Sequence, residues 1–183
     1  HPLPPPPKRH LALTAACGAC GREALPDLGK LGLSPPPPLA VDPDLLLALP
    51  ERLGEAQRLF RATGGLHAAA LFDREGRLVA LREDVGRHNA LDKLIGWAFL
   101  QGKLPLHDHI LLVSGRAGYE LLVKAVAAGI PVFCAVSAPT SLAVALAQAY
   151  GLTLVGFLRP GRMNVYAGRE RVGPPRGLPN PCG

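Results

Sequence analysis

Two cysteines near the start of the chain are the first residues whose types and spacing could do chemistry. Cys17 and Cys20 are separated by two residues, and Gly18 and Gly21 follow them in turn. Such a pair can supply half of a zinc site, or it can present a reactive thiolate that carries sulfur. Zinc needs two more ligands, and no second cysteine pair stands at ligand spacing. From spacing alone the zinc site and the reactive thiol are about equally favoured, and two unreactive surface thiols are the third alternative.

The other two cysteines have different surroundings. Cys134 lies in a predicted buried strand, where a cysteine usually serves as a small apolar side chain. Cys182 lies in a proline-rich C-terminal tail. Four cysteines in 183 residues are too few for a protein held together by disulfides. If the Cys17–Cys20 pair is a reactive thiol rather than half of a zinc site, we expect Cys17 to be the nucleophile and Cys20 its helper, because the first thiol of such a pair is usually the nucleophile.

Polar, glycine and arginine residues cluster at four places where a predicted strand ends, namely residues 83–89, 114–116, 137–141 and 159–162. In open α/β sheets, ligands bind beyond the carboxyl ends of the parallel strands, where helix N-termini favour anions. Arginines in three of these segments can make bidentate contacts to phosphate. Four solvated turns would be the simpler explanation, but their shared edge favours one anion site. The candidate binding residues are His88, Ser114, Gly115, Arg116, Ser137, Arg159, Pro160, Gly161 and Arg162.

The elements that must position these segments follow from hydrophobic periodicity. Helices are expected over residues 43–63, 87–98, 118–128 and 139–150, and strands over residues 66–72, 77–82, 109–113, 130–136 and 152–158. A short sixth strand is possible at residues 164–166. This order predicts an α/β fold with a mixed five-stranded sheet, one antiparallel strand and helices on both faces. Residues 1–42 are expected to form a tail and a mobile loop, residues 43–168 the folded domain, and residues 169–183 a second tail.

The composition narrows the class of protein and of partner. Hydrophobic residues make up 48% of the chain and charged residues 19%, which excludes a disordered protein. The net charge of +6 suggests an anionic partner. Only 5% of the residues are aromatic and no long run of Lys and Arg occurs, so we expect a phosphate-bearing small molecule rather than nucleic acid.

A long uncharged segment raises the question of a membrane. Residues 125–158 carry no charge and could span a bilayer by length alone. Gly129, Pro131 and Pro139 divide the segment into pieces of strand and helix length, so we expect buried elements of a core and no membrane partner. The first residues are rich in proline and lack the apolar region of a secretory signal, so we expect no such signal before this segment.

Seven short segments, taken in order, carry a family resemblance: residues 17–21, 63–67, 83–90, 114–116, 129–131, 137–144 and 156–159. The stretch 83–93 is the most specific. Together, over about residues 16–166, they resemble the FdhD family, the sulfur carriers or sulfurtransferases needed to make active formate dehydrogenase. Members usually carry a strand-rich segment before the cysteine loop, whereas only residues 1–16 precede Cys17 here.

The resemblance implies a cytidine-deaminase-like fold, a cytoplasmic homodimer and a transfer of sulfur. A cysteine desulfurase would load a persulfide onto the Cys17–Cys20 loop. The sulfur would pass to the molybdenum or tungsten of a bis-molybdopterin guanine dinucleotide cofactor, which then enters formate dehydrogenase. The last motif adds Phe157 and Leu158 to the candidate binding residues. Guanosine diphosphate (GDP) is expected to bind as a fragment of this cofactor, and no resident metal is expected.

Two other functions stay open at this point. A chaperone that only binds and protects the cofactor would work without its cysteines. A zinc deaminase, suggested by the fold, would need a glutamate close after a histidine such as His67 and a cysteine pair further on. The sequence has neither at the required spacing, and residues 137–139 stand where the cysteine motif would begin.

Overall fold

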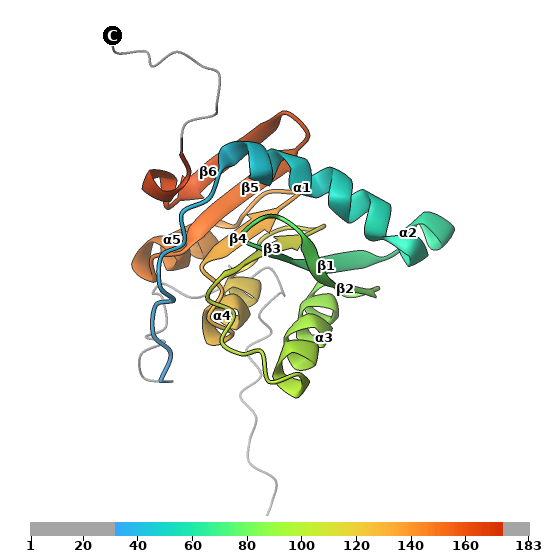
Figure 1. Ribbon diagram of the computed structural model, residues 1–183, viewed down its shortest axis with the longest axis horizontal. Helices are drawn as coiled ribbons and strands as arrows, with labels where there is room; N and C mark the ends of the chain where they lie inside the picture. Colours follow the sequence, from blue (N-terminus) through green and yellow to red (C-terminus); the bar gives the residue numbers. More distant parts are fainter. Residues whose placement is uncertain (1–31, 174–183) are drawn as a thin grey trace, which may run out of the picture.

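The computed structural model describes residues 32–173, so Cys17, Cys20 and Cys182 lie outside the described residues. The strands are β1 (His67–Asp73), β2 (Leu78–Asp84), β3 (His109–Val113), β4 (Val132–Ala135), β5 (Thr153–Arg159) and β6 (Arg162–Ala167). The helices are α1 (Pro43–Ala56), α2 (Arg58–Thr63), α3 (Arg87–Leu100), α4 (Tyr119–Ala127) and α5 (Ser141–Ala149), followed by a 3-10 turn at Arg169–Arg171. Figure 1 shows these elements as a twisted sheet between layers of helices.

The strands form one mixed sheet in the order β2-β1-β3-β4-β5-β6. Strands β3, β4 and β5 are parallel, β1 is antiparallel to both of its neighbours, and β6 is antiparallel to β5. The mixed α/β sheet is therefore confirmed, with two differences from the prediction. The sixth strand is a full element, and two strands rather than one run against the parallel set. The cause is the tight turn at Gly161, whose φ of 76° lets the chain reverse directly from β5 into β6.

Helices cover both faces of the sheet, as expected. Alternate strand residues point to opposite faces, so Leu112 belongs to the core beneath α1, whereas Leu111 belongs to the core beneath α3, α4 and α5. Helix α1 buries Leu46, Leu49 and Leu53 on its side. The two apolar layers fix the position of the strand ends that carry the candidate site.

The helical segment before the sheet is capped at both ends and is divided into two helices. The Asp42 carboxylate accepts a hydrogen bond from the backbone N–H of Asp44 at 2.9 Å, and Gly64 ends α2 with a φ of 68°. Pro50 lies inside α1, although proline is best accommodated in the first turn of a helix, and the predicted helical segment 43–63 is broken at Gln57. Continuous burial of the leucine stripe against the sheet offsets the hydrogen bond that Pro50 cannot make.

Residues near the two ends of the described chain pack together. The Val41 N–H donates to the carbonyl of Arg171 at 2.9 Å, and the Arg171 guanidinium donates to the buried Thr153 hydroxyl at 3.0 Å. These contacts attach the 3-10 turn, which was expected within the C-terminal tail, to the edge of the sheet.

Candidate functional site

The four polar segments lie along one edge of the sheet. Strand β2 is antiparallel to β1, and β1 is antiparallel to β3, so β2 points in the same direction as β3, β4 and β5. Each of the segments 83–89, 114–116, 137–141 and 159–162 lies at, or just after, the C-terminal end of one of these strands. The prediction that all four share an edge is confirmed, whereas their binding of an anion stays a prediction.

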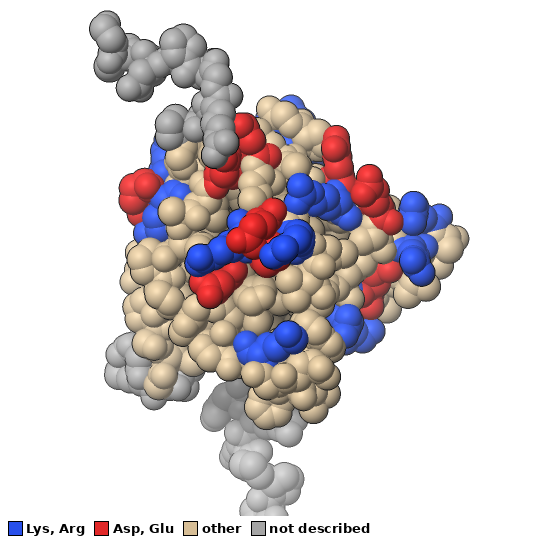
Figure 2. Space-filling view, in the orientation of Figure 1, with Lys and Arg blue, Asp and Glu red and all other residues tan. Residues whose placement is uncertain are grey.

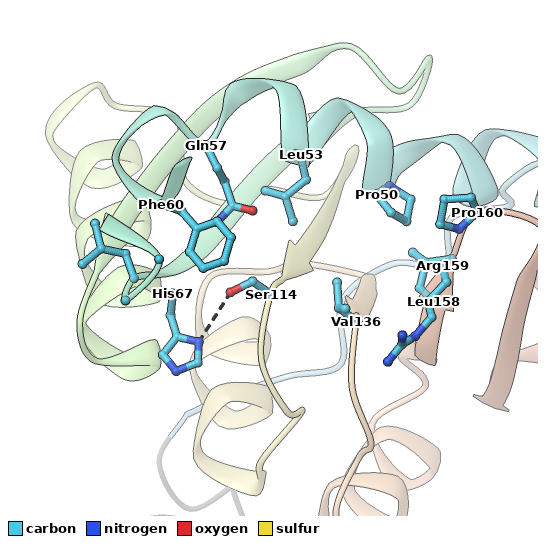
Figure 3. A pocket seen from close by; sticks show the side chains of 14 residues that line it. Pro50, Leu53, Gln57, Phe60, His67, Ser114, Val136, Leu158, Arg159 and Pro160 are labelled. Carbon is cyan, nitrogen blue, oxygen red and sulfur yellow. Dashed lines mark hydrogen bonds between the residues drawn. The ribbon is translucent and has the colours of Figure 1, made fainter. Parts of the chain in front are cut away.

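A pocket of about 600 Å³ lies between this edge and the helices α1 and α2. Four of the candidate residues line it: Ser114, Leu158, Arg159 and Pro160. Figure 3 shows that Leu53 and Phe60 close it from the helical side, while Val136 and Leu158 form the wall at the strand ends. The pocket is therefore mostly apolar, with a few polar groups around it, which is the usual composition of a small-molecule site.

His67 and Ser114 form the polar corner of the pocket (Figure 3). The Ser114 hydroxyl oxygen accepts a hydrogen bond from the Ala68 N–H at 2.8 Å and lies 3.5 Å from Nδ1 of His67. A Cβ at Gly115 would come 3.4 Å from the same ring nitrogen. Gly115 therefore helps the site indirectly, because its missing side chain lets the His67 ring pack against the loop.

Two further residues of the pocket were not predicted from the sequence. The side chain of Gln57 is buried at the break between α1 and α2, and Phe60 in α2 is 41% exposed. His67 also lines the pocket and is not among the predicted binding residues. The glycines before His67 were the only sequence signal near it, and nothing in the local pattern around Gln57 marks a helix break.

A second pocket of about 410 Å³ opens at the turn between β5 and β6, lined by Phe157, Arg159, Arg162 and Asn164. Arg159 lines both pockets. Phe157 has a φ of 50°, which is unfavourable for a residue with a side chain, and its N–H donates to the carbonyl of Ser137 at 3.1 Å. The strained backbone coincides with an irregular register in β5 and leaves the Phe157 ring 39% exposed.

The remaining candidates stand apart from both pockets. Arg116 is exposed, and Ser137 contributes its backbone carbonyl to the hydrogen bond with Phe157. His88 lies in the first turn of α3, where its Nε2 is 3.4 Å from the Glu120 carboxylate of α4. Burial, and next the charge of Arg87, lower the pKa of His88, although Glu120 opposes this shift. The structure therefore places His88 between two helices rather than in a pocket.

The described residues also bear on metal binding, on membrane insertion and on the surface charge of the protein. Within residues 32–173, no group of three His, Cys, Asp or Glu side chains is arranged to bind a metal ion. None of the helices in this part of the chain is long and apolar enough to cross a membrane. On the face seen in Figure 2, Lys and Arg side chains are interspersed with Asp and Glu.

Comparisons with known proteins agree on one family. Residues 4–173 match the model of the FdhD/NarQ family. The chain is 57% identical over 168 residues to the sulfur carrier protein FdhD of Streptomyces avermitilis, covering 90% of this chain and 60% of that protein. It is 50% identical over 164 residues to the protein of the same name from Sulfurisphaera tokodaii, covering 90% of this chain and 63% of the relative.

A solved structure shows the same fold. The crystal structure of a proposed formate dehydrogenase accessory protein from Desulfotalea psychrophila superposes with a TM-score of 0.70 at 31% sequence identity. The match covers 77% of this chain and 58% of that protein. The chain thus spans about 60% of the length of the curated relatives that it matches. The family model, these relatives and this structure place the chain in the FdhD/NarQ family.

Proposed function

We propose that the protein is a sulfur carrier that acts in the maturation of formate dehydrogenase. The relatives named sulfur carrier protein FdhD, at 50–57% identity, support the first part. The neighbour from Desulfotalea psychrophila supports the second. The observation that carries the proposal for this chain is the pocket edge at Arg159, where a nucleotide-sized pocket lies next to a guanidinium in a member of this family.

Cys17 is the residue proposed to carry the sulfur. Its thiolate attacks the outer sulfur of a persulfide on a cysteine desulfurase, a new S–S bond forms, and the desulfurase thiolate leaves. The proton balance is kept because one thiol proton is lost by Cys17 and one is taken up by the departing thiolate. Cys17 then holds a persulfide, which is one sulfur heavier than the free thiol.

Cys20 is proposed to release the sulfur. Its thiolate attacks the inner sulfur of the Cys17 persulfide, a disulfide forms between the two cysteines, and hydrosulfide leaves with the electron pair. The acceptor is the molybdenum or tungsten of a bis-molybdopterin guanine dinucleotide, the cargo that is later inserted into formate dehydrogenase. A thiol reductant restores the two cysteines for the next cycle.

The edge of the sheet is proposed to hold this cargo by its nucleotide ends. Arg159 and Arg162 would bind phosphate oxygens, because a guanidinium donates two parallel hydrogen bonds to such groups. A pocket of about 600 Å³ has room for one heterocycle and its sugar rather than for the entire cofactor. GDP is therefore the fragment expected to bind by itself.

Intact mass spectrometry tests the sulfur carrier function. The 183-residue chain is incubated with a cysteine desulfurase and cysteine, and a gain of about 32 Da, one sulfur atom, is expected and mapped by digestion to Cys17. Cys17→Ser should abolish the adduct, whereas Cys20→Ser should retain it and lose activation of formate dehydrogenase. Activation by both variants would contradict sulfur transfer and support a chaperone that only protects the cofactor. If Cys20→Ser failed to activate formate dehydrogenase while Cys17→Ser activated it fully, the roles of the two cysteines would be reversed.

A homodimer in the cytoplasm completes the proposal. Helix α5 packs Ala143, Leu146 and Ala147 inward and leaves half-buried Leu142 and Val144 beside its exposed residues, which gives a second copy an apolar surface to contact. Two copies would offer matching sites for the two guanine ends of the cofactor. Light scattering at working concentration should give the mass of a dimer, and a monomer mass would contradict it.

A further inference from the structure

Gln57 is a buried polar residue for which the described part of the chain provides no partner. The residue as a whole is only 7% exposed. Its backbone N–H donates to the carbonyl of Leu53 at 3.0 Å, but its carboxamide makes no hydrogen bond to any residue between 32 and 173. The carboxamide atoms are not among the fully buried, unpartnered side-chain atoms of the described residues, so they open onto the pocket that Gln57 lines, where a ligand or an ordered water can bind them.

The N-cap hydrogen bonds of α2, which a residue at the position of Gln57 often provides, are made by Glu83 instead. Gln57 stands at the N-cap position of α2, where a side chain often accepts hydrogen bonds from the first free N–H groups, yet it makes no such bond. The N–H groups of Leu59 and Phe60 donate instead to the Glu83 carboxylate, at 3.1 and 2.9 Å. The carboxamide of Gln57 is therefore free to point into the pocket, where Figure 3 shows it beside the Phe60 ring.

The surroundings of the carboxamide suit a flat, polar-edged molecule. Leu53, Val136 and Leu158 provide apolar walls, and the partly exposed Phe60 ring can stack on a planar group. A carboxamide carries one acceptor and one donor side by side, and it pairs with a heterocycle that presents an adjacent N–H and C=O. Arg159 lines the same pocket and can hold the phosphate that follows.

We infer that Gln57 recognises the heterocyclic edge of the bound nucleotide or pterin through a paired hydrogen bond in this pocket. The inference rests on the proposed function, whose cargo contains guanine and pterin. Both rings carry the same 2-amino-4-oxopyrimidine edge, so both offer the adjacent N–H and C=O that the carboxamide complements. Because a carboxamide also pairs with adenine, Gln57 provides recognition of the ring and not a choice between the two purines.

Calorimetry on the full chain with three probes tests this role. Gln57→Leu keeps the volume and removes both hydrogen-bonding groups. GDP affinity is expected to fall roughly tenfold, the value of one bidentate pair, whereas the affinity for inorganic pyrophosphate, which has no ring, should not change. Gln148→Leu, at an exposed position on α5, is the matched control and should bind GDP like the parent chain. Unchanged pyrophosphate binding also shows that the variant is folded.

Neopterin, a pterin without phosphate, distinguishes the two sources of the ring. A loss of GDP affinity alone assigns guanine to the pocket, a loss of neopterin affinity alone assigns the pterin, and loss of both assigns the shared edge. If Gln57→Leu binds GDP and neopterin as tightly as the parent, the role of Gln57 is wrong although the nucleotide site stands. If the parent chain binds neither probe, the proposed cargo site fails and the inference fails with it.

Discussion

Glu83, the penultimate residue of the edge strand β2, caps the helix that carries Phe60. One carboxylate oxygen accepts the N–H of Phe60 at 2.9 Å, and the other accepts the N–H of Leu59 at 3.1 Å. First-turn N–H groups have no partner within a helix, so these bonds satisfy donors that would otherwise need water. The backbone carbonyl of Glu83 in turn accepts a hydrogen bond from Lys93 of α3 at 3.2 Å. One residue thus connects β2, α3 and the wall of the main pocket.

Glu83→Ala should destabilise the protein and weaken its ligand pocket. Loss of a helix cap typically costs about 1 kcal/mol, and here α2 would also lose its attachment to the sheet. We expect a lower free energy of unfolding in urea and a weaker affinity for GDP, because Phe60 would no longer be held at the pocket. Glu83→Gln keeps one acceptor and should lie between the parent and the alanine variant. Glu75→Ala, in the exposed turn after β1, is the control; equal effects from the two alanine variants would contradict the capping role.

Periodicity in the sequence was sufficient to predict most of the sheet. The third strand was expected at residues 109–113, and β3 spans His109–Val113. The shared edge of the four polar segments also followed, because it depends only on strand direction. The break at Gln57 could not be predicted, since the helix ends there through contacts with Glu83, which is 24 residues away from Leu59. Local patterns contain no information about such a long-range hydrogen bond.

His67 and His88 show a second limit of prediction from the sequence. The sequence favours His88 and not His67 as a binding residue, whereas the structure places His67 in the pocket and His88 against Glu120. Whether His88 faces the pocket or Glu120 of α4 depends on the rotation of α3 about its axis. This rotation is set by the burial of Leu91 and Leu94 against the sheet, so it is known only once the layers are packed.

Asp84 should make the free energy of unfolding depend on pH in the acidic range. The ion pair with Lys93, the N–H of Gly86 and the amide of Asn89 lower the pKa of the Asp84 carboxyl from 3.8 to about 2. The unfolded chain therefore binds a proton at higher pH than the folded one. The stabilisation is complete above the unfolded pKa of 3.8 and is lost as the pH falls towards 2.

Replacement of this carboxylate checks that pH dependence. Asp84→Asn should unfold at lower urea concentration than the parent at about pH 6, and the gap should narrow as the pH approaches about 3. The comparison uses the free energy of unfolding at each pH, so changes common to both chains cancel. A gap that stays constant across this range would show that Asp84 does not cause the dependence.

Two glycine substitutions should change stability in opposite directions. A Cβ at Gly156 in β5 would lie 2.8 Å from Pro139 and 2.9 Å from the Tyr166 ring, so Gly156→Ala forces the loop after β4 outward. Overpacking of this kind costs about 1–3 kcal/mol. A Cβ at Gly96 in α3 meets nothing within 4 Å, and Gly96→Ala should stabilise by roughly 0.5–1 kcal/mol through helix propensity. Thermal unfolding of both variants measures the contrast, and shifts of the same sign would contradict it.

Cys134 should be inert to thiol reagents while the protein is folded. The side chain is fully buried in β4, and burial raises the pKa of its thiol, so almost no thiolate forms at neutral pH. Alkylation of the folded chain followed by mass mapping should leave Cys134 unmodified, and alkylation in denaturant should modify it. Cys134→Ala should retain sulfur loading. Modification of Cys134 in the folded protein would mean that this strand opens on the time scale of the reaction.

Arg159 should supply the largest single contribution of charge to nucleotide binding, because it lines both pockets at the sheet edge. Arg159→Ala should weaken GDP roughly tenfold or more, as expected for a charge-assisted bidentate contact, and the loss should shrink at high salt. Arg159→Lys keeps the charge but not the paired geometry and should lie between the two. Arg74→Ala is the matched control, since Arg74 pairs with Asp108 at the opposite edge of the sheet. If Arg159→Ala binds GDP as the Arg74 variant does, the phosphate does not lie at the turn between β5 and β6.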